Sequence, residues 1–180
     1  MLNNAKVMMM LRLAVFSTWV ALGAGCGLDD EDVPEQEAVQ LPQAVSGGWS
    51  TFPSVCIQSW CVNHGNLVRL WQSILWADNM FSDVNQIDGD FGPHTDGWTH
   101  NWQLKYVPGD DSHIVGTNTW NAAAKHLDFE PNGDTCQFGV YHFIYVGASH
   151  SFRVTENCST FEWKFANPRT GTLTDTSYDY

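Results

Sequence analysis

The segment from residue 65 to residue 79 carries the clearest hydrophobic pattern of the chain. Its apolar residues recur at steps of three and four, which places them on one side of an α-helix. These residues are Leu67, Leu70, Trp71, Ile74 and Leu75. Asn79 follows them, and Asn tolerates the left-handed conformation that is common just past helix ends. The pattern therefore predicts a helix that ends before Asn79.

A second helix is predicted after a glycine-rich turn. Trp98 and Trp102 are spaced for one side of a helix, and Thr95 is placed to act as the N-cap of its first turn. Pro93 disfavours helix upstream of this point. The sequence Val107-Pro108-Gly109 breaks the helical pattern, so the second helix is expected to end there.

A third helix is predicted to begin within the segment "IVGTNTW", residues 114–120. Thr117 or Asn118 can serve as its N-cap, because both side chains accept a hydrogen bond from a free backbone N–H group. Three apolar residues are then expected to face inward, namely Trp120, Ala123 and Ala124. The middle of the chain is thus predicted to be a three-helix module.

The turns before the second and third helices repeat one pattern. "FGPHT" (91–95) matches "VGTNT" (115–119), with the two central glycines 24 residues apart. Each copy has an apolar residue, a glycine that lets the backbone turn and a threonine that can cap a helix. Turn and cap roles are assigned to Phe91, Gly92, Thr95, Gly116 and Thr119 of the two copies, and to Gly89 just before the first copy. Duplication favours a structural role for the turns over a catalytic one.

Residues 127–180 have a different pattern. They are rich in aromatic and β-branched residues, Phe161, Trp163 and Phe165 alternate with polar ones, and Gly and Pro interrupt the runs. Three or four antiparallel strands are predicted, which either pack on the helices or form a second binding surface. The expected fold class is α+β, with a small three-helix module (49–126) followed by a short, disulfide-stabilised antiparallel β-sheet extension (127–180).

The N-terminus is typical of an exported protein. Lys6 and Arg12 precede a short apolar stretch that ends in small residues, so residues 1–25 are predicted to be a signal peptide. Two interpretations of Cys26 stay open: lipid modification, or ordinary signal-peptide cleavage nearby. Residues 26–48 are interpreted as an acidic flexible linker, since 27–48 hold six carboxylates, two prolines and no aromatic residue.

Four further cysteines fit export to an oxidising compartment. Proximity along the chain favours the pairs Cys56–Cys61 and Cys136–Cys158 among the three pairings that four cysteines allow. A metal site is disfavoured because CxxC spacing is absent. With 180 residues the chain can bury one core, and a net charge of −12 argues against nucleic acid. Its nine Trp and ten Phe favour a weakly charged ligand held by stacking and hydrogen bonds.

Four segments carry a resemblance to a known family. They are "VRLWQSIL" (68–75), "IDGDFGPHT" (87–95), "WQ" (102–103) and "IVGTNTW" (114–120). In this order and spacing they resemble the peptidoglycan-binding domain of the three-helix type, whose pattern runs V..LQ..L, DG.FG..T, FQ and DG.VG..TW. The resemblance covers about residues 62–125. It implies a module that holds cell-wall glycopeptide non-covalently and has no chemistry of its own.

The resemblance also assigns roles to single residues. Asp88 would stabilise the first turn by accepting hydrogen bonds from nearby backbone N–H groups. Phe91 would fill a position in the core. Trp71 and Trp102 would fill core positions where the family has Leu and Phe. The second turn, "DDSHIVG", lacks the Asp-Gly pair and is expected to be one residue longer than the first. Trp98 stands where a small residue is usual, so it belongs either to a repacked core or to a sugar-binding surface.

Candidate ligand-binding residues cluster around the first turn and the second helix. They are Asp88, His94, Asp96, Trp98, His100 and Asn101. Asp96 and His100 are four apart and can share a helix face, but two ligands do not make a metal site. The segment from Asp83 also lacks the glycine and glutamate of a calcium loop. No metal and no cofactor is therefore expected.

The expected function is non-catalytic binding of peptidoglycan, through its glycan or its stem peptide, by an extracellular or cell-envelope protein. Any membrane attachment would come only from a lipid on Cys26. One alternative is a secreted interaction or inhibitor protein that uses the β-rich C-terminal region. Another is an undetected cell-wall hydrolase, which is less favoured because no GxSxG elbow is present and little chain remains for a hydrolase domain.

Overall fold

The computed structural model describes residues 48–177. The predicted signal peptide, most of the predicted linker with Cys26, and the last three residues lie outside this range. Three α-helices and a five-stranded sheet make up the described part, so the α+β class is confirmed. Within residues 48–177, none of the helices combines the length and the apolar character needed to cross a bilayer.

The three predicted helices are present. Their bounds are Asn66–Ala77 for α1, Pro93–Tyr106 for α2 and Thr117–Ala124 for α3, with short 3-10 turns at Trp49–Thr51 (η1) and Val84–Gln86 (η2). The apolar stripe of α1 is fully buried. Asn79, just past α1, has φ 62°, the left-handed conformation predicted for it.

The sheet has five strands where three or four were predicted. They are β1 (Leu127–Phe129), β2 (Val140–Val146), β3 (Ser151–Asn157), β4 (Trp163–Ala166) and β5 (Leu173–Asp175). Each strand pairs antiparallel with the next, in the order β1-β2-β3-β4-β5. β1 and β5 have only three residues each, too few to show an alternating pattern in the sequence.

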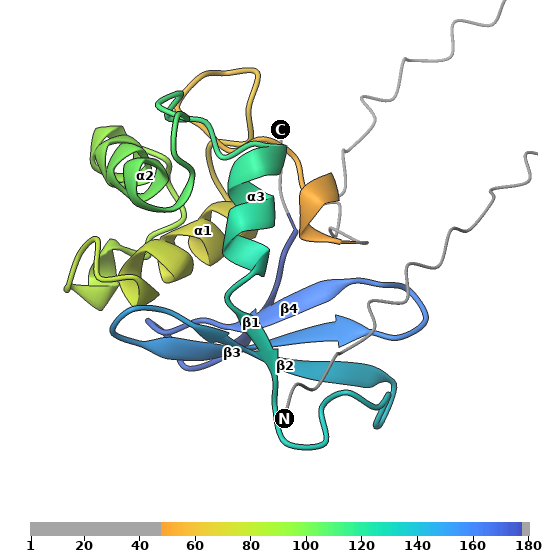
Figure 1. The fold of residues 1–180 in the computed structure, drawn as a ribbon. Helices are drawn as coiled ribbons and strands as arrows, with labels where there is room; N and C mark the ends of the chain where they lie inside the picture. The colour runs from red at the N-terminus through yellow and green to blue at the C-terminus, as the bar shows by residue number, and fades with distance from the viewer. Residues whose placement is uncertain (1–47, 178–180) are drawn as a thin grey trace, which may run out of the picture. The chain divides into compact units, whose positions relative to one another are not determined.

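The helices lie on one side of the sheet (Figure 1). One apolar cluster joins the two layers, and Trp49 of η1 lies within it. The indole of Trp49 stacks on Tyr145 of β2 at 6.3 Å between ring centroids and meets Trp120 of α3 edge-on at 6.0 Å. The C-terminal strands therefore pack directly on the helical module and share its core.

A buried carboxylate connects helices and sheet. Asp78, just after α1, is 1% exposed and has no cationic partner among the described residues. Its Oδ2 accepts hydrogen bonds of 2.7 Å from Trp102 Nε1 and from the Tyr145 hydroxyl. Its Oδ1 accepts from the Tyr106 hydroxyl at 3.2 Å and from the Ala148 N–H at 3.0 Å. Four donors thus satisfy a charge that would otherwise be costly to bury.

Both predicted disulfides are present. Cys56 and Cys61 have Cα atoms 5.4 Å apart, and those of Cys136 and Cys158 are 6.2 Å apart. The second bond joins the loop before β2 to the turn after β3. Two disulfides in so short a chain are typical of proteins from an oxidising compartment.

Candidate functional site

A glutamine of α1 holds the first glycine turn in place. The side-chain amide of Gln72 donates to Asp88 Oδ1 at 2.8 Å and to the Asp90 carbonyl at 3.1 Å. In return, its Oε1 accepts from the Gly89 N–H at 2.8 Å. Asp88 Oδ1 also accepts from the Asp90 N–H at 2.9 Å, so Asp88 anchors the turn as predicted.

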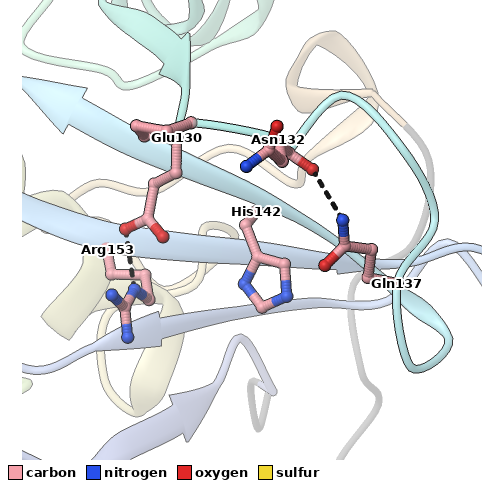
Figure 2. A pocket seen from close by; sticks show the side chains of 7 residues that line it. Glu130, Asn132, Gln137, His142 and Arg153 are labelled. Atoms are coloured by element: carbon pink, nitrogen blue, oxygen red, sulfur yellow. Dashed lines mark hydrogen bonds and ion pairs between the residues drawn. The ribbon is translucent and has the colours of Figure 1, made fainter.

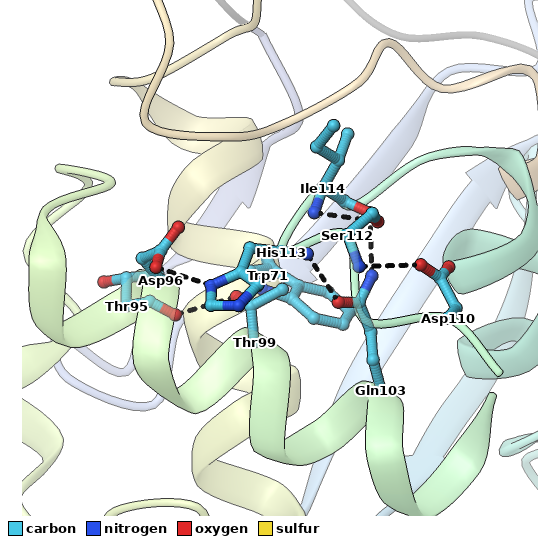
Figure 3. A network of polar contacts seen from close by, with 9 residues as sticks. All are labelled: Trp71, Thr95, Asp96, Thr99, Gln103, Asp110, Ser112, His113 and Ile114. Atoms are coloured by element: carbon cyan, nitrogen blue, oxygen red, sulfur yellow. Dashed lines mark hydrogen bonds and ion pairs between the residues drawn. The ribbon is translucent and has the colours of Figure 1, made fainter. Parts of the chain in front are cut away.

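A glutamine of α2 holds the second turn in the same way (Figure 3). The amide of Gln103 donates to the Ile114 carbonyl at 2.8 Å and to Thr119 Oγ1 at 3.0 Å. Its Oε1 accepts from the His113 N–H at 3.1 Å. The repeat seen in the sequence is therefore a repeat of hydrogen bonding as well as of residue types.

The two turns have the same length, so the expected extra residue in the second turn is absent. Gly89 and His113 occupy equivalent places, since each N–H donates to the clamping glutamine. Both have positive φ, 90° for Gly89 and 60° for His113. His113 thus adopts the left-handed conformation without being glycine, which is uncommon outside functional or tightly held turns.

Thr95 is not the N-cap of α2. The helix begins at Pro93, and Gly92 is the N-cap, with no side-chain hydrogen bond. Proline suits this first helical position because the N–H group that it lacks would have no partner there. Thr95 lies inside the first turn of the helix, where its Oγ1 accepts from Gln72 Nε2 at 3.2 Å and lies 3.4 Å from the Asp90 carbonyl.

The same correction applies to α3. Its N-cap is Gly116, while Thr117 and Asn118 are its first two residues. Thr119 is likewise not a cap: its Oγ1 accepts from Gln103 Nε2 and lies 3.4 Å from the Ile114 carbonyl. In both helices the threonine supports the glutamine clamp, because its hydroxyl can accept and donate at once.

A single segment, residues 55–63, connects the two turns. The Val115 N–H of the second turn donates to the Val55 carbonyl at 2.9 Å. The Phe91 N–H of the first turn donates to the Asn63 carbonyl at 2.7 Å. Phe91 and Val115 are equivalent residues of the repeat, and both are buried, so the core role predicted for Phe91 is confirmed.

The disulfide Cys56–Cys61 closes a small loop within this connecting segment. Trp60 in that loop is 62% exposed, whereas the other tryptophans within residues 48–177 are buried or half-buried. Ile57 in the same loop is also exposed. Trp60 was not among the binding residues predicted from the sequence. A bulky side chain inside so short a disulfide loop cannot easily reach the core. The position of Trp60 between Cys56 and Cys61 could therefore have indicated that it is exposed.

A pocket of about 210 Å³ lies at the first turn. This first-turn pocket is lined by Gln86, Asp88, Asp90, Gly92, Pro93, His94 and Thr95. It brings together two predicted ligand-binding residues, Asp88 and His94. Trp98 meets the His94 ring edge-on at 5.7 Å and packs against Phe81 at 4.4 Å. Trp98 is half-buried: part of its side chain packs against the core, and the rest is exposed to solvent.

Three other predicted residues lie further along α2. Asp96 and His100 do share a face of the helix, and the structure adds His113 to them. The Nδ1 atom of His113 lies 2.7 Å from Asp96 Oδ2 (Figure 3), and the His113 ring stacks on His100 at 4.4 Å. Asn101 is exposed and does not line the first-turn pocket. Within residues 48–177, no three acidic, His or Cys side chains are placed to hold a metal ion.

The sheet carries a further pocket, of about 220 Å³, here called the sheet pocket. Figure 2 shows its labelled residues, Glu130, Asn132, Gln137, His142 and Arg153. Arg153 Nε donates to Glu130 Oε1 at 2.7 Å. A neighbouring hollow of about 230 Å³ shares His142 and is also lined by Thr155, Lys164 and Leu173. Two hollows thus lie side by side on the sheet, and the second is lined mainly by apolar surface.

Comparison with models of protein families, with curated proteins and with solved structures gives no match. The similarity to peptidoglycan-binding domains therefore rests on the four sequence motifs.

Proposed function

We propose that the protein binds bacterial cell-wall peptidoglycan non-covalently through the first-turn pocket. One observation carries this proposal: Asp88 and His94 line the same hollow, with Trp98 against His94. All three are among the six candidate ligand contacts in the sequence, and Trp98 adjoins the hollow through its contact with His94.

The chemistry of the pocket suits this polymer. Wall glycan and stem peptide present hydroxyl, amide and amino groups. Carboxylates such as those of Asp88 and Asp90 accept hydrogen bonds from all of these, and an imidazole can accept or donate. The exposed part of Trp98 offers an apolar surface beside them for a sugar ring. A few polar groups beside an aromatic surface are typical of small-ligand sites.

Hydrogen bonds also hold the turn in a defined conformation. Asp88 is held by Gln72 and by its own turn, and His94 lies in the first turn of α2. Little conformational entropy then remains to be lost on binding, which favours affinity.

The proposed location is the outside of the cell or the cell envelope. Two disulfides and the predicted signal peptide support export. A net charge of −12 would repel anionic wall polymers at low salt. Screening limits this repulsion at physiological ionic strength, where the Debye length is about 8 Å.

Co-sedimentation tests the proposal. The oxidised protein without its signal peptide, residues 27–180, is mixed with purified sacculi, with chitin and cellulose as control polymers. We expect pelleting with sacculi alone, and weaker pelleting for Trp98→Ala and His94→Ala. His64→Ala serves as a matched control, because His64 is exposed and does not line the first-turn pocket. Equal pelleting with all three polymers, or with none, would contradict the proposal.

Two results of the same experiment point to other functions. Release of muropeptides into the supernatant would indicate a hydrolase. Failure to pellet, together with capture of an envelope protein that is lost in His142→Ala, would indicate an interaction or inhibitor protein. The observation that favours this second candidate is the pair of hollows that share His142 on the sheet.

A further inference from the structure

A third hollow, of about 350 Å³, lies between α1, the first turn and the β4–β5 hairpin. This arginine pocket is lined by Asn66, Arg69, Ile87, Asn167 and Arg169, together with three threonines between residues 170 and 174. Ile87 lines the arginine pocket, while its neighbours Gln86 and Asp88 line the first-turn pocket. The two pockets therefore flank the same turn.

Arg69 is fixed against the turn. Its Nη1 donates to Asn66 Oδ1 at 2.8 Å and its Nη2 donates to the Asp88 carbonyl at 3.0 Å. The guanidinium lies over Gly89, where a Cβ atom would come within 2.7 Å of the Arg69 Cζ. Glycine at this position thus leaves room for the arginine as well as permitting the positive φ.

Arg169 reaches the same turn from the sheet. Its Nη1 donates to the Ile87 carbonyl at 3.3 Å, next to the carbonyl that Arg69 contacts. A guanidinium has five N–H donors, so most of those on Arg169 have no acceptor within residues 48–177. Two guanidinium groups, each with N–H donors that have no acceptor among the described residues, therefore face one hollow.

Asn167 adds a further donor to the lining. The residue is 4% exposed, and its Oδ1 accepts from the Arg169 N–H at 2.9 Å, which fixes the orientation of the amide. The Nδ2 group on the other side of the amide has no acceptor in the part of the chain that the structure describes. Because the side chain lines the pocket, this donor is available to a ligand there.

The lining contains no acidic side chain, although the chain carries 20 Asp and Glu against 8 Lys and Arg. Neither arginine forms an ion pair within residues 48–177. Two uncompensated cations, neutral donors and no carboxylate define a site for an anion. We propose that the arginine pocket binds a carboxylate group, which for the natural ligand is a carboxylate of the peptidoglycan stem peptide.

The anion site follows from the lining itself, whereas its assignment to the stem peptide rests on the proposed function. A carboxylate matches the planar fork of an arginine and can be held by two parallel hydrogen bonds. A phosphate dianion would be repelled twice as strongly by the net charge of −12. A ligand that spans the turn would place its carboxylate in the arginine pocket and its neutral groups in the first-turn pocket.

Titration with small probes tests the proposal. The probes are acetyl-D-alanyl-D-alanine, the same dipeptide with a C-terminal carboxamide, and inorganic phosphate, followed by the NMR signals of the arginine Nε–H groups. We expect saturable shifts at Arg69 and Arg169 with the free carboxylate only. Arg169→Gln should weaken binding at least about tenfold, and Arg169→Lys should be intermediate, because it keeps the charge but loses the fork. Lys125→Gln, which removes the same charge at an exposed site outside the pocket, should bind normally.

Equal binding of the carboxamide, or unchanged binding by Arg169→Gln, would overturn the proposal. Tighter binding of phosphate than of the dipeptide would overturn the choice of a carboxylate. Sacculus pelleting separates this inference from the proposed function. Wild-type protein that pellets but binds no carboxylate contradicts the inference alone. Protein that binds the dipeptide but does not pellet contradicts the proposed function and leaves the carboxylate site in place.

Discussion

The Tyr145 hydroxyl donates a hydrogen bond of 2.7 Å to Asp78 Oδ2, which ties strand β2 to the end of α1. Trp102 of α2 donates to the same oxygen at the same distance. Three elements far apart in the sequence thus meet at one buried oxygen atom. The stability of the fold should depend strongly on this oxygen, because each donor would otherwise be buried without an acceptor.

Asp78→Asn should destabilise the protein by about 3 kcal/mol, since the amide replaces an acceptor by a donor facing two buried donors. Urea unfolding followed by fluorescence measures this. Asp111→Asn is the control, because Asp111 is exposed and the substitution makes the same change of charge. Its effect should stay within about 0.5 kcal/mol. Equal effects of the two variants would show that the buried carboxylate does not hold the layers together.

Tyr145 should make the fold sensitive to alkali. Burial, and then the negative charge of Asp78, raise the pKa of Tyr145 above its ordinary value of 10.0. Above pH 10 the unfolded chain loses this proton while the folded protein keeps it, so stability falls as pH rises further. Tyr145→Phe should be less stable at pH 7 but should lose less stability between pH 9 and pH 11. Parallel stability curves for the two proteins would contradict this expectation.

Two glycines should respond to alanine in opposite directions. Gly89→Ala should lower the free energy of unfolding by at least about 1 kcal/mol. The reason is that Gly89 has a φ of +90° and the new methyl group would collide with the Arg69 guanidinium. Gly97→Ala should stabilise by about 0.5–1 kcal/mol, because Gly97 lies inside α2 with open space around its Cα. Thermal unfolding of both variants is the measurement. A stabilising effect of Gly89→Ala would mean that the turn is less constrained than the structure indicates.

Glu156 of β3 should reduce stability at neutral pH. Burial raises the pKa of its carboxyl group above the ordinary value of 4.5. Its contribution to stability is therefore fully present below pH 4.5 and is lost as pH rises through the folded pKa. Glu156→Gln should raise the melting temperature at pH 7 and lose this advantage near pH 4. A variant that melts lower than the wild type at pH 7 would contradict the prediction.

The helical part of the fold could be predicted from the sequence because the patterns that indicate it lie within short segments. The spacing of apolar residues at steps of three and four predicted the buried side of α1. The repeated glycines predicted both turns. The helix starts were misplaced because threonine is a common N-cap. Here Thr95 and Thr119 instead bond to Gln72 and Gln103, and these contacts depend on tertiary structure. Local propensity cannot separate the two roles of a threonine near a helix start.

The candidate site was predicted only in part. Asp88 and His94 were found because they lie beside a recognisable turn. His113 and the arginine pocket were missed, since they depend on contacts across long stretches of chain. Arg69 and Arg169 are a hundred residues apart in the sequence, yet they contact neighbouring carbonyls of one turn. Nothing in either local sequence indicates that pairing.

The uneven burial of the tryptophans has an optical consequence. Trp49, Trp71, Trp102, Trp120 and Trp163 are buried, whereas Trp60 projects from its disulfide loop. Iodide, which does not enter a close-packed interior, should therefore quench the emission of Trp60 in preference to that of the buried indoles. The protein thus carries a natural reporter between its two turns, and a ligand that covers this loop should shield that reporter from the quencher.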